Sequence, residues 1–358
     1  MKILSVVGAR PQFIKLAVLS HEIRKRFNEV IVHTGQHYDY EMSKIFFEQL
    51  DIPNPDYNLE VGSGSHGKQT GEIIIRLEKV IIKEKPDLVL VYGDTNSTLG
   101  GALCAAKLGI SVCHVESGMR SYDKIPEEIN RVVADHISDI FFCVTETAVR
   151  NLEIEGIIKN VFLVGDLMID ALVEHLKLAE KKSNILKELG LRKNTYMLAT
   201  IHRTENTEDR LKLKSIIEGL ISSNEKIILP LHPRTKKYLQ AYSLIEKIKN
   251  SGIRIIKPLP YLDMLILEKN SRKIITDSGG VQKEAYFLKV PCITSRTITE
   301  WKETVENGFN ILVGSDSSKI HKAIKNFEIS QKYIELYGKG DTSKKIADVL
   351  VKLKNKIK

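Results

Sequence analysis

Short runs of Val, Ile and Leu recur along the chain, and each ends in a polar or glycine turn followed by a helical pattern of apolar positions. This alternation predicts parallel strands joined by helices that cover both faces of a sheet. A charged stretch from 180 to 194 interrupts the pattern, which then restarts. The predicted strands are Ile3–Val7, Val30–Thr34, Leu88–Tyr92, Ser111–Val115, Ile140–Val144 and Val161–Val164 before this stretch, and Tyr196–Ile201, Lys226–Leu231, Arg254–Ile256, Arg272–Thr276, Pro291–Thr294 and Asn310–Val313 after it.

Two successive alternating halves predict an α/β protein with two doubly wound, Rossmann-like domains. We expect an N-terminal domain at 1–178, a linker at 179–194, a C-terminal domain at 195–340 and a C-terminal helix at 341–358 that could pack back on the N-terminal domain. Ligands of such sheets bind beyond the carboxyl ends of the strands. The active site is therefore expected at those ends, in a cleft between the two domains.

Composition excludes some classes of partner. The formal net charge of +9 is spread along the chain, and no recognition helix or aromatic-basic module accompanies it, so we expect no nucleic-acid partner. No apolar run approaches the roughly 20 residues of a membrane span, and no secretory leader is visible before the first strand. We expect a cytoplasmic protein with no membrane partner. Its four cysteines lie in apolar surroundings without Cys-x-x-Cys spacing, which is typical of reduced, buried thiols and not of a zinc site: Cys104, Cys113, Cys143 and Cys292.

The segment from Thr276 to Ala285 joins a predicted strand to a predicted helix through Ser278-Gly279-Gly280. Glycines let the backbone approach an anion closely, and a helix N-terminus offers unpaired N–H groups, so this corner suits a phosphate. Glu284, one turn further on, can accept hydrogen bonds from a sugar diol. The same residues equally predict a tight turn with Ser278 as a helix cap.

Cationic groups follow two other strands of the second half. His202-Arg203 follows Tyr196–Ile201, and His232-Pro233-Arg234 follows Lys226–Leu231. A single histidine at such a position is most often structural. Two of them at the same sheet edge as the Ser-Gly-Gly corner indicate a clamp for a diphosphate.

Acidic residues follow the strands of the first half. Asp94 and Glu116 each stand at a strand end, and Glu127 opens the next helix. An isolated acid at such a position is usually a cap or compensates the helix dipole. Several acids from different strands at one sheet edge indicate general acid and base catalysis instead.

Arg10 and Lys15 follow the first strand, where both could reach an anion at the same edge. The turn between them lacks the Lys-Ser/Thr pair of a Walker loop and the Gly-x-Gly-x-x-Gly pattern of a dinucleotide site. Taken alone, this segment would be interpreted as an ordinary turn followed by a surface lysine.

Taken in order, these motifs resemble the non-hydrolysing UDP-N-acetylglucosamine 2-epimerases, and the resemblance covers nearly the whole chain. It implies a glycosyltransferase-B-like fold and inversion at carbon 2 of the sugar, by elimination of UDP to a glycal and re-addition. No cofactor and no metal would be required. The matching segments are Gly8–Gln12 with Lys15, Gly93–Thr95, His114–Arg120, Pro126–Glu128 with Asn130 and Arg131, His202-Arg203, His232-Pro233, and Thr276–Glu284.

By position, the resemblance implies that three carboxylates act as acid and base, that His202 assists the departing phosphate and that Glu284 binds the ribose hydroxyls. The product would be UDP-N-acetylmannosamine for surface polysaccharides, and a homodimer is expected because the family is commonly dimeric. The implied catalytic residues are Asp94, Glu116, Glu127, His202 and Lys15; the implied substrate-binding residues are Arg10, Arg131, His232, Ser278, Gly279, Gly280 and Glu284.

Three alternatives for the reaction remain open. Trp301-Lys302 stands where the bacterial enzymes of this family usually have Arg-Pro, and a similar Thr-Glu-Trp occurs in relatives that act on UDP-2,3-diacetamido sugar acids. A hydrolysing 2-epimerase would release free N-acetylmannosamine. A glycosyltransferase on the same fold would transfer the sugar without proton exchange at carbon 2.

Overall fold

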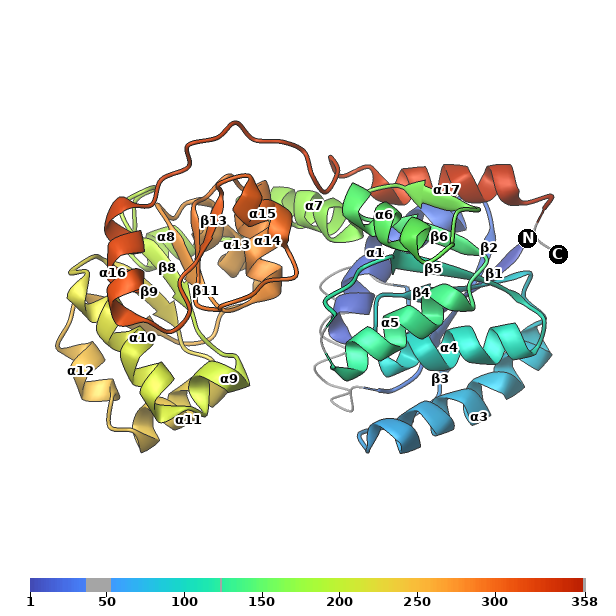
Figure 1. The fold of residues 1–358 in the computed structure, drawn as a ribbon, viewed down its shortest axis with the longest axis horizontal. Coiled ribbons are helices and arrows are strands. Elements are labelled where there is room, and N and C mark those ends of the chain that lie inside the picture. Colours follow the sequence, from blue (N-terminus) through green and yellow to red (C-terminus); the bar gives the residue numbers. More distant parts are fainter. Residues whose placement is uncertain (37–52, 123, 357–358) are drawn as a thin grey trace. The chain divides into compact units, whose positions relative to one another are not determined.

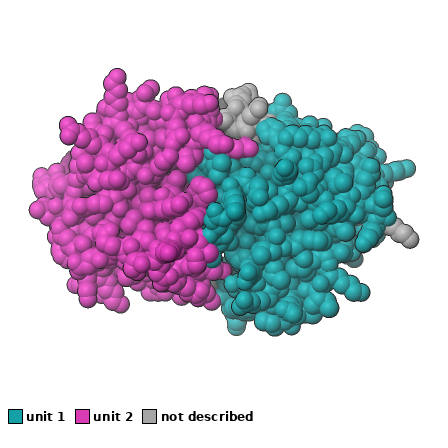
Figure 2. Space-filling model, turned by 90° about the horizontal axis from the view of Figure 1, so that it is seen from above, with its two compact units in different colours: residues 1–173, 335–358 teal, residues 174–334 magenta. Residues whose placement is uncertain are grey.

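The computed structural model of the chain describes residues 1–36, 53–122 and 124–356. These residues form two compact units, coloured separately in Figure 2: residues 1–173 together with 335–358, and residues 174–334. Each unit is built on its own parallel sheet with helices packed against it (Figure 1). The predicted α/β class is therefore confirmed.

The first unit contains a seven-stranded parallel sheet in the order β3-β2-β1-β4-β5-β6-β7. Its elements are β1 (Lys2–Val7), α1 (Arg10–Arg24), β2 (Asn28–His33), β3 (Tyr57–Asn58), α3 (His66–Glu84), β4 (Leu88–Tyr92), α4 (Asn96–Lys107), β5 (Ser111–Ser117), α5 (Pro126–His136), β6 (Ile140–Cys143), α6 (Glu146–Ile154), β7 (Val161–Leu163), the first turns of α7 (Leu167–Lys182), and α17 (Thr342–Leu353).

Successive side chains of a strand point to opposite faces of this sheet, so the central strands contribute side chains to two separate hydrophobic cores. In β4, Leu90 and Tyr92 pack with residues of α1 and α17, whereas Val89 and Val91 pack with residues of α3 and α4. A strand buried on both faces must be apolar at nearly every position. This is the reason for the uninterrupted Val and Leu runs in the sequence.

The last helix, α17, completes the core of the first unit. Its Ile346 and Leu350 are fully buried in the same cluster as Ile14 and Ala17 of α1. The N-terminus of α17 is held by Asp170, whose Oδ1 accepts from the Thr342 amide at 3.0 Å and whose Oδ2 accepts from the Ser343 amide at 2.7 Å. Residues from the two ends of the chain thus share one core.

The second unit contains a six-stranded parallel sheet in the order β10-β9-β8-β11-β12-β13. Its elements after α7 are α8 (Ile185–Glu188), β8 (Met197–Thr200), α9 (Thr204–Thr207), α10 (Arg210–Ser222), β9 (Ile227–Pro230), α11 (Pro233–Ala241), α12 (Ile245–Lys249), β10 (Ile253–Ile256), α13 (Tyr261–Lys269), β11 (Ile274–Thr276), α14 (Gly279–Phe287), β12 (Cys292–Thr294), α15 (Lys302–Glu306), β13 (Asn310–Leu312) and α16 (Ser317–Asn326).

Every strand predicted from the sequence overlaps an observed strand, with ends that differ by at most two residues. The hydrophobic pattern missed β3, in which Tyr57 and Asn58 pair with Val32 and His33 of β2 at the sheet edge. Two residues are too few to show a periodicity. All four cysteines are buried and free, as predicted. Within the described part of the chain, no helix combines the length and apolar character needed to cross a membrane.

Candidate active site

The acidic residues of the first unit lie at neighbouring strand ends. Strands β1, β4 and β5 are adjacent in the sheet, and their carboxyl ends lead to Lys15, Asp94 and Glu116. In parallel sheets these ends form one edge, where ligands bind. The structure therefore brings together three of the predicted catalytic residues.

Lys15 and Glu116 form an ion pair, and both side chains are largely buried. Glu116 has a left-handed backbone, with φ of 71°, and the register of β5 against β6 shifts between Val115 and Ser117. Such an irregularity re-aims a side chain at the end of a strand. A Cβ atom on Gly93 would lie 3.5 Å from Glu116 Oε2 and 3.6 Å from Lys15 Nζ, so the pair sits directly beside the turn after β4.

Asp94 follows this turn and forms an ion pair with Arg131 of α5. Its side chain is 36% exposed, whereas that of Arg131 is 12% exposed. The Nδ2 atom of Asn130 donates to the Asp94 carbonyl at 2.9 Å and holds the backbone against α5. The carboxylate is thus fixed by one cation and remains accessible from solvent.

The two adjacent acids at the start of α5 have different environments. Glu127 is exposed and makes no side-chain hydrogen bond or ion pair with another described residue. Glu128 is buried, and its carboxylate accepts from the Ser121 and Tyr122 amides at 3.0 and 3.1 Å. Burial opposes ionisation of Glu128, but these amides outweigh it and its pKa lies below the ordinary value. Glu128 therefore holds the preceding turn, whereas the Glu127 carboxylate is exposed to solvent.

A buried network beneath this edge supports the turn after β4. His114 Nδ1 lies 2.7 Å from Asp135 Oδ1, and His114 Nε2 lies 2.7 Å from the Gly93 carbonyl oxygen. The ring therefore lies between the Asp135 carboxylate and the backbone of the turn after β4. Asp135 also accepts from Arg120 Nη1 at 2.7 Å. Burial opposes its ionisation, but His114 and Arg120 outweigh it and hold the pKa of Asp135 below its ordinary value.

Gln12 joins the ends of β1 and β4. Its Oε1 accepts from the Gly8 and Ala9 amides at 2.8 and 3.0 Å, and its Nε2 donates to the Tyr92 carbonyl at 2.8 Å. A Cβ atom on Gly8 would lie only 2.0 Å from Thr34 Oγ1, so glycine is required there. The backbone of Arg10 opens α1, and its side chain lies outside the described part of the structure.

In the second unit the predicted nucleotide residues also follow adjacent strands, β9, β8 and β11. The buried carboxylate of Asp277 organises this edge. It accepts from the amides of His202 and Arg203 and from Asn206 Nδ2, each at 3.0 Å. Asp277 is therefore the structural acid of the Thr-Asp-Ser-Gly-Gly segment and places the turn after β8 beside the turn after β11.

His202 and His232 lie side by side, with ring centroids 5.5 Å apart and planes inclined by 39°. His232 Nδ1 accepts from the Arg234 amide at 3.2 Å, so the ring carries its hydrogen on Nε2. Partial burial, His202 and Arg234 lower the pKa of His232 below its ordinary value. Near neutral pH the His232 ring is thus a neutral donor beside His202.

Ser278 caps α14, since its Oγ accepts from the Val281 amide at 3.5 Å. The cap and a phosphate site are compatible, because the amides of the first turn have no intrahelical partner. A Cβ on Gly279 would lie 2.5 Å from Glu300 Oε1, whereas the nearest side-chain atom to one on Gly280 would be Ser278 Oγ at 3.8 Å. A Cβ atom at 279 would therefore displace the Glu300 carboxylate, whereas one at 280 would meet only ordinary contacts.

Glu300 and Trp301 form the support beneath this corner. Glu300 accepts from Arg296 Nη1 at 2.7 Å and lies 3.9 Å from Arg203 Nη2. Trp301 is buried, and the Nζ of Lys283 lies 4.0 Å from the centroid of its ring. The Thr-Glu-Trp segment singled out from the sequence thus lies under the glycine turn.

Glu284 lies one turn into α14 and is half-buried. The hydroxyl of Tyr261, from α13, donates to Glu284 Oε1 at 2.9 Å. A carboxylate held in this way keeps further lone pairs for other donors.

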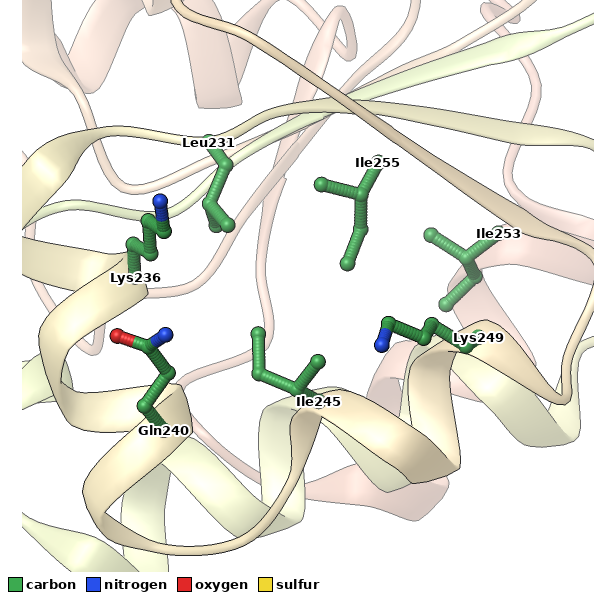
Figure 3. Close-up of a pocket in the computed structure, with 7 residues that line it drawn as sticks. All are labelled: Leu231, Lys236, Gln240, Ile245, Lys249, Ile253 and Ile255. Atoms are coloured by element: carbon green, nitrogen blue, oxygen red, sulfur yellow. The ribbon is translucent and has the colours of Figure 1, made fainter.

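A separate cavity of about 550 Å³ lies by the edge strand β10 (Figure 3). Two lysines stand on opposite sides of it with isoleucines between them, and it contains none of the predicted site residues. The lining residues are Leu231, Lys236, Gln240, Ile245, Lys249, Ile253 and Ile255.

Several supporting residues were not assigned a role from the sequence. Gln12 and Asp277 were inside recognised motifs, and their side-chain partners come from other strands. Asp135 and Tyr261 lie in helices without any local signal. Among the described residues, no group of three or more His, Cys, Asp or Glu side chains is arranged to hold a metal ion.

The chain is similar to proteins of one family over almost its full length. A sequence profile described as UDP-N-acetylglucosamine 2-epimerase matches residues 21–351. A UDP-N-acetylglucosamine 2-epimerase homolog of Methanococcus maripaludis is 60% identical, covering 98% of this chain and 99% of the relative. The UDP-2,3-diacetamido-2,3-dideoxy-D-glucuronate 2-epimerase of Pseudomonas aeruginosa is 46% identical, covering 99% of this chain and 100% of the relative.

A crystal structure of the Methanocaldococcus jannaschii UDP-GlcNAc 2-epimerase in complex with UDP-GlcNAc and UDP superposes with a TM-score of 0.86. That protein is 48% identical in sequence, and the alignment covers 98% of this chain and 100% of the other. Together with the ordered strand-end motifs, these similarities show that the chain belongs to the UDP-N-acetylglucosamine 2-epimerase family.

Proposed function

We propose that this protein interconverts UDP-N-acetylglucosamine and UDP-N-acetylmannosamine by eliminating UDP across carbons 1 and 2 and adding it back. Carbon 2 is not adjacent to a carbonyl group, so its proton is not acidic enough for direct exchange. Elimination gives a glycal, which is protonated from the other face before UDP returns. The reaction requires a base, an acid and cations that stabilise the departing diphosphate.

The observation that carries the proposal is the meeting of Lys15, Asp94 and Glu116 at three adjacent strand ends. Asp94, Glu116 and the exposed Glu127 supply candidates for the base and the acid. Lys15 supplies positive charge, and Arg131 holds Asp94. Arg10 is proposed to bind the substrate, which is the role that the resemblance implies.

In the second unit, we assign the UDP moiety to the residues that follow β8, β9 and β11. His202 and His232, whose rings lie side by side, are proposed to donate to phosphate oxygens, and His202 is proposed to assist the departing diphosphate. Ser278, Gly279 and Gly280 present the first-turn amides of α14. Glu284 accepts from the ribose hydroxyls.

A second candidate substrate is a UDP-2,3-diacetamido sugar acid. It is favoured by the Pseudomonas aeruginosa relative, whose name states that activity, and by Trp301 after Thr299-Glu300. The same elimination and re-addition would apply, because the chemistry at carbon 2 is unchanged. Only the contacts to carbons 3 and 6 of the sugar would differ.

The decisive experiment is incubation with UDP-N-acetylglucosamine in heavy water, followed by NMR. UDP-N-acetylmannosamine with deuterium at carbon 2 would support the epimerase. Free N-acetylmannosamine with UDP would identify a hydrolysing 2-epimerase, and transfer to an acceptor without deuterium exchange would identify a glycosyltransferase. Incubation with UDP-2,3-diacetamido-2,3-dideoxyglucuronate under the same conditions tests the second candidate.

Two further parts of the proposal concern the setting of the enzyme. The four free, buried cysteines support work in the reducing cytoplasm. We also propose a homodimer, and sedimentation equilibrium at micromolar concentration would test it.

A further inference from the structure

Glu268 is a buried acid that the proposed reaction does not use. It lies on α13 and is 2% exposed, and Leu265 and Leu267 of the same helix are fully buried. The Oε2 atom of Glu268 is buried and has no conventional hydrogen-bond donor among the described residues. Its side chain is in hydrogen-bond contact with Glu284, which is also an acid.

Two carboxyl groups in hydrogen-bond contact must share a proton, because two carboxylates can only accept. Burial, and then the neighbouring Glu284, raise the pKa of Glu268 well above its ordinary value, and no cation contributes. Glu284 is less buried and accepts from the Tyr261 hydroxyl at 2.9 Å. Both differences place the proton on Glu268 and the negative charge on Glu284.

We propose that Glu268 is a positioning residue, a neutral carboxylic acid that donates to the Glu284 carboxylate and, together with Tyr261, fixes Glu284 for the ribose diol of UDP. The proposal rests on the assignment of the UDP moiety to this edge of the second unit. A buried carboxylic acid kept neutral is an effective hydrogen-bond donor. Two donors from α13 leave Glu284 with one orientation, so that its remaining lone pairs point in a fixed direction.

Two substitutions distinguish the effect of a hydrogen-bond donor at position 268 from the effect of side-chain volume. Glu268→Gln keeps an N–H donor toward Glu284, whereas Glu268→Leu keeps the volume and removes the donor. Calorimetric titration with UDP and with 2′-deoxy-UDP then measures, for each protein, the ratio of the two affinities, which reports the contact with the ribose 2′-hydroxyl. The wild type and Glu268→Gln should prefer UDP by about tenfold or more, the effect of one hydrogen bond to a charged group.

Glu268→Leu should lose about tenfold in affinity for UDP and little for 2′-deoxy-UDP, so that its preference falls towards one. In turnover, its KM for the UDP-sugar should rise while kcat changes less than about twofold, because the ribose contact is the same in ground and transition states. Tyr261→Phe removes the other donor to Glu284 and should reduce the preference for UDP in the same way. It replaces Glu268→Leu as the test if that variant does not fold.

Tyr196→Phe is the matched control. It removes a buried hydroxyl that donates to the Leu267 carbonyl at 2.7 Å on the same helix, so it should lower the melting temperature and leave the UDP preference unchanged. A folded Glu268→Leu protein with the wild-type preference for UDP would overturn the proposal, as would a Glu268→Gln protein that behaves like Glu268→Leu. A wild type that binds neither nucleotide would instead overturn the proposed function.

Discussion

Lys15 pairs with a Glu116 whose backbone is in the left-handed region, at the point where β5 changes register. A left-handed conformation costs a non-glycine residue about 1 to 2 kcal/mol, so the surrounding structure must hold it in place. Glycine would adopt this backbone readily but would bring no carboxylate. An acid at this strand end is therefore present together with a strained backbone.

A double-mutant cycle can separate the contribution of the Lys15–Glu116 pair to stability from its contribution to the reaction. Lys15→Met leaves a largely buried carboxylate unpaired and should lower the free energy of unfolding by about 2 kcal/mol. Adding Glu116→Gln removes that unpaired charge and should restore most of the stability in urea titrations. Activity should stay abolished in the double variant. Recovered turnover would contradict roles for both residues in the reaction.

Replacing Asp94 by Asn tests the acid and base assignment. Asparagine keeps an oxygen for Arg131 and the size of the side chain, but it cannot exchange a proton at neutral pH. We expect kcat to fall at least about 100-fold, the range of general acid and base catalysis, while the Kd for UDP stays within about threefold. Near-normal turnover in deuterium-exchange assays would remove Asp94 from the mechanism.

The neighbours Glu127 and Glu128 provide a matched pair. Glu127→Gln should lower kcat by about 100-fold without changing the melting temperature, because the side chain is exposed and has no partner among the described residues. Glu128→Gln should lower the melting temperature, because its carboxylate holds the Ser121 and Tyr122 amides. The reverse pattern in thermal unfolding and kinetics would exchange the two assignments.

The two glycines at the start of α14 should respond in opposite directions to alanine. In Gly279→Ala the new Cβ meets the Glu300 carboxylate, so we expect about 1 kcal/mol of lost stability and weaker UDP binding. In Gly280→Ala the methyl group meets no atom closer than 3.8 Å, and alanine favours the helix by up to about 1 kcal/mol. Urea unfolding of both variants measures the sign of each change in the free energy of unfolding. Equal changes in the two variants would show that Glu300 moves aside.

His175, on α7, gives stability a dependence on pH. Its side chain is buried against Tyr261, and burial lowers its pKa from 6.5 to about 4. The unfolded chain therefore binds more protons than the folded chain between these values, so this contribution is full above pH 6.5 and is lost as the pH falls towards 4. At pH 5.5 the loss should be roughly 1 to 1.5 kcal/mol.

The control for this prediction is a comparison of three proteins. His175→Phe should flatten the change in unfolding free energy between pH 7.5 and 5.5 relative to the wild type. His321→Gln, which alters a histidine outside the core, should leave the change as in the wild type. Identical pH dependence in all three proteins would mean that His175 titrates normally in the fold.

The fold was largely predictable because every central strand is buried on both faces. Burial of this kind imposes uninterrupted apolar runs, and Leu88–Tyr92 was recognised to the residue. The predicted site residues at strand ends were also brought together within each sheet, since parallel strands share one carboxyl edge. Their catalytic and binding roles remain predictions.

The residues that support the site residues could not be predicted from local sequence patterns. Asp277 and Asp135 act through partners that are 71 to 75 and 15 to 21 positions away in the sequence, respectively. The difference between Glu127 and Glu128 depends on which side of α5 faces the turn at 121–122. Trp301 was singled out as a possible mark of substrate identity, and its burial under the glycine turn comes from packing that the sequence pattern does not encode.

The sharing of one core by α1 and α17 sets an order for folding during synthesis. Residues 174–334 form a unit from one continuous stretch of chain, which is synthesised before α17. The first unit, although its sheet is made first, lacks Ile346 and Leu350 until α17 has been synthesised. The nascent N-terminal sheet must therefore wait with part of its apolar surface uncovered, and a stop codon shortly before α17 would leave Asp94 and Glu116 on an unfinished domain.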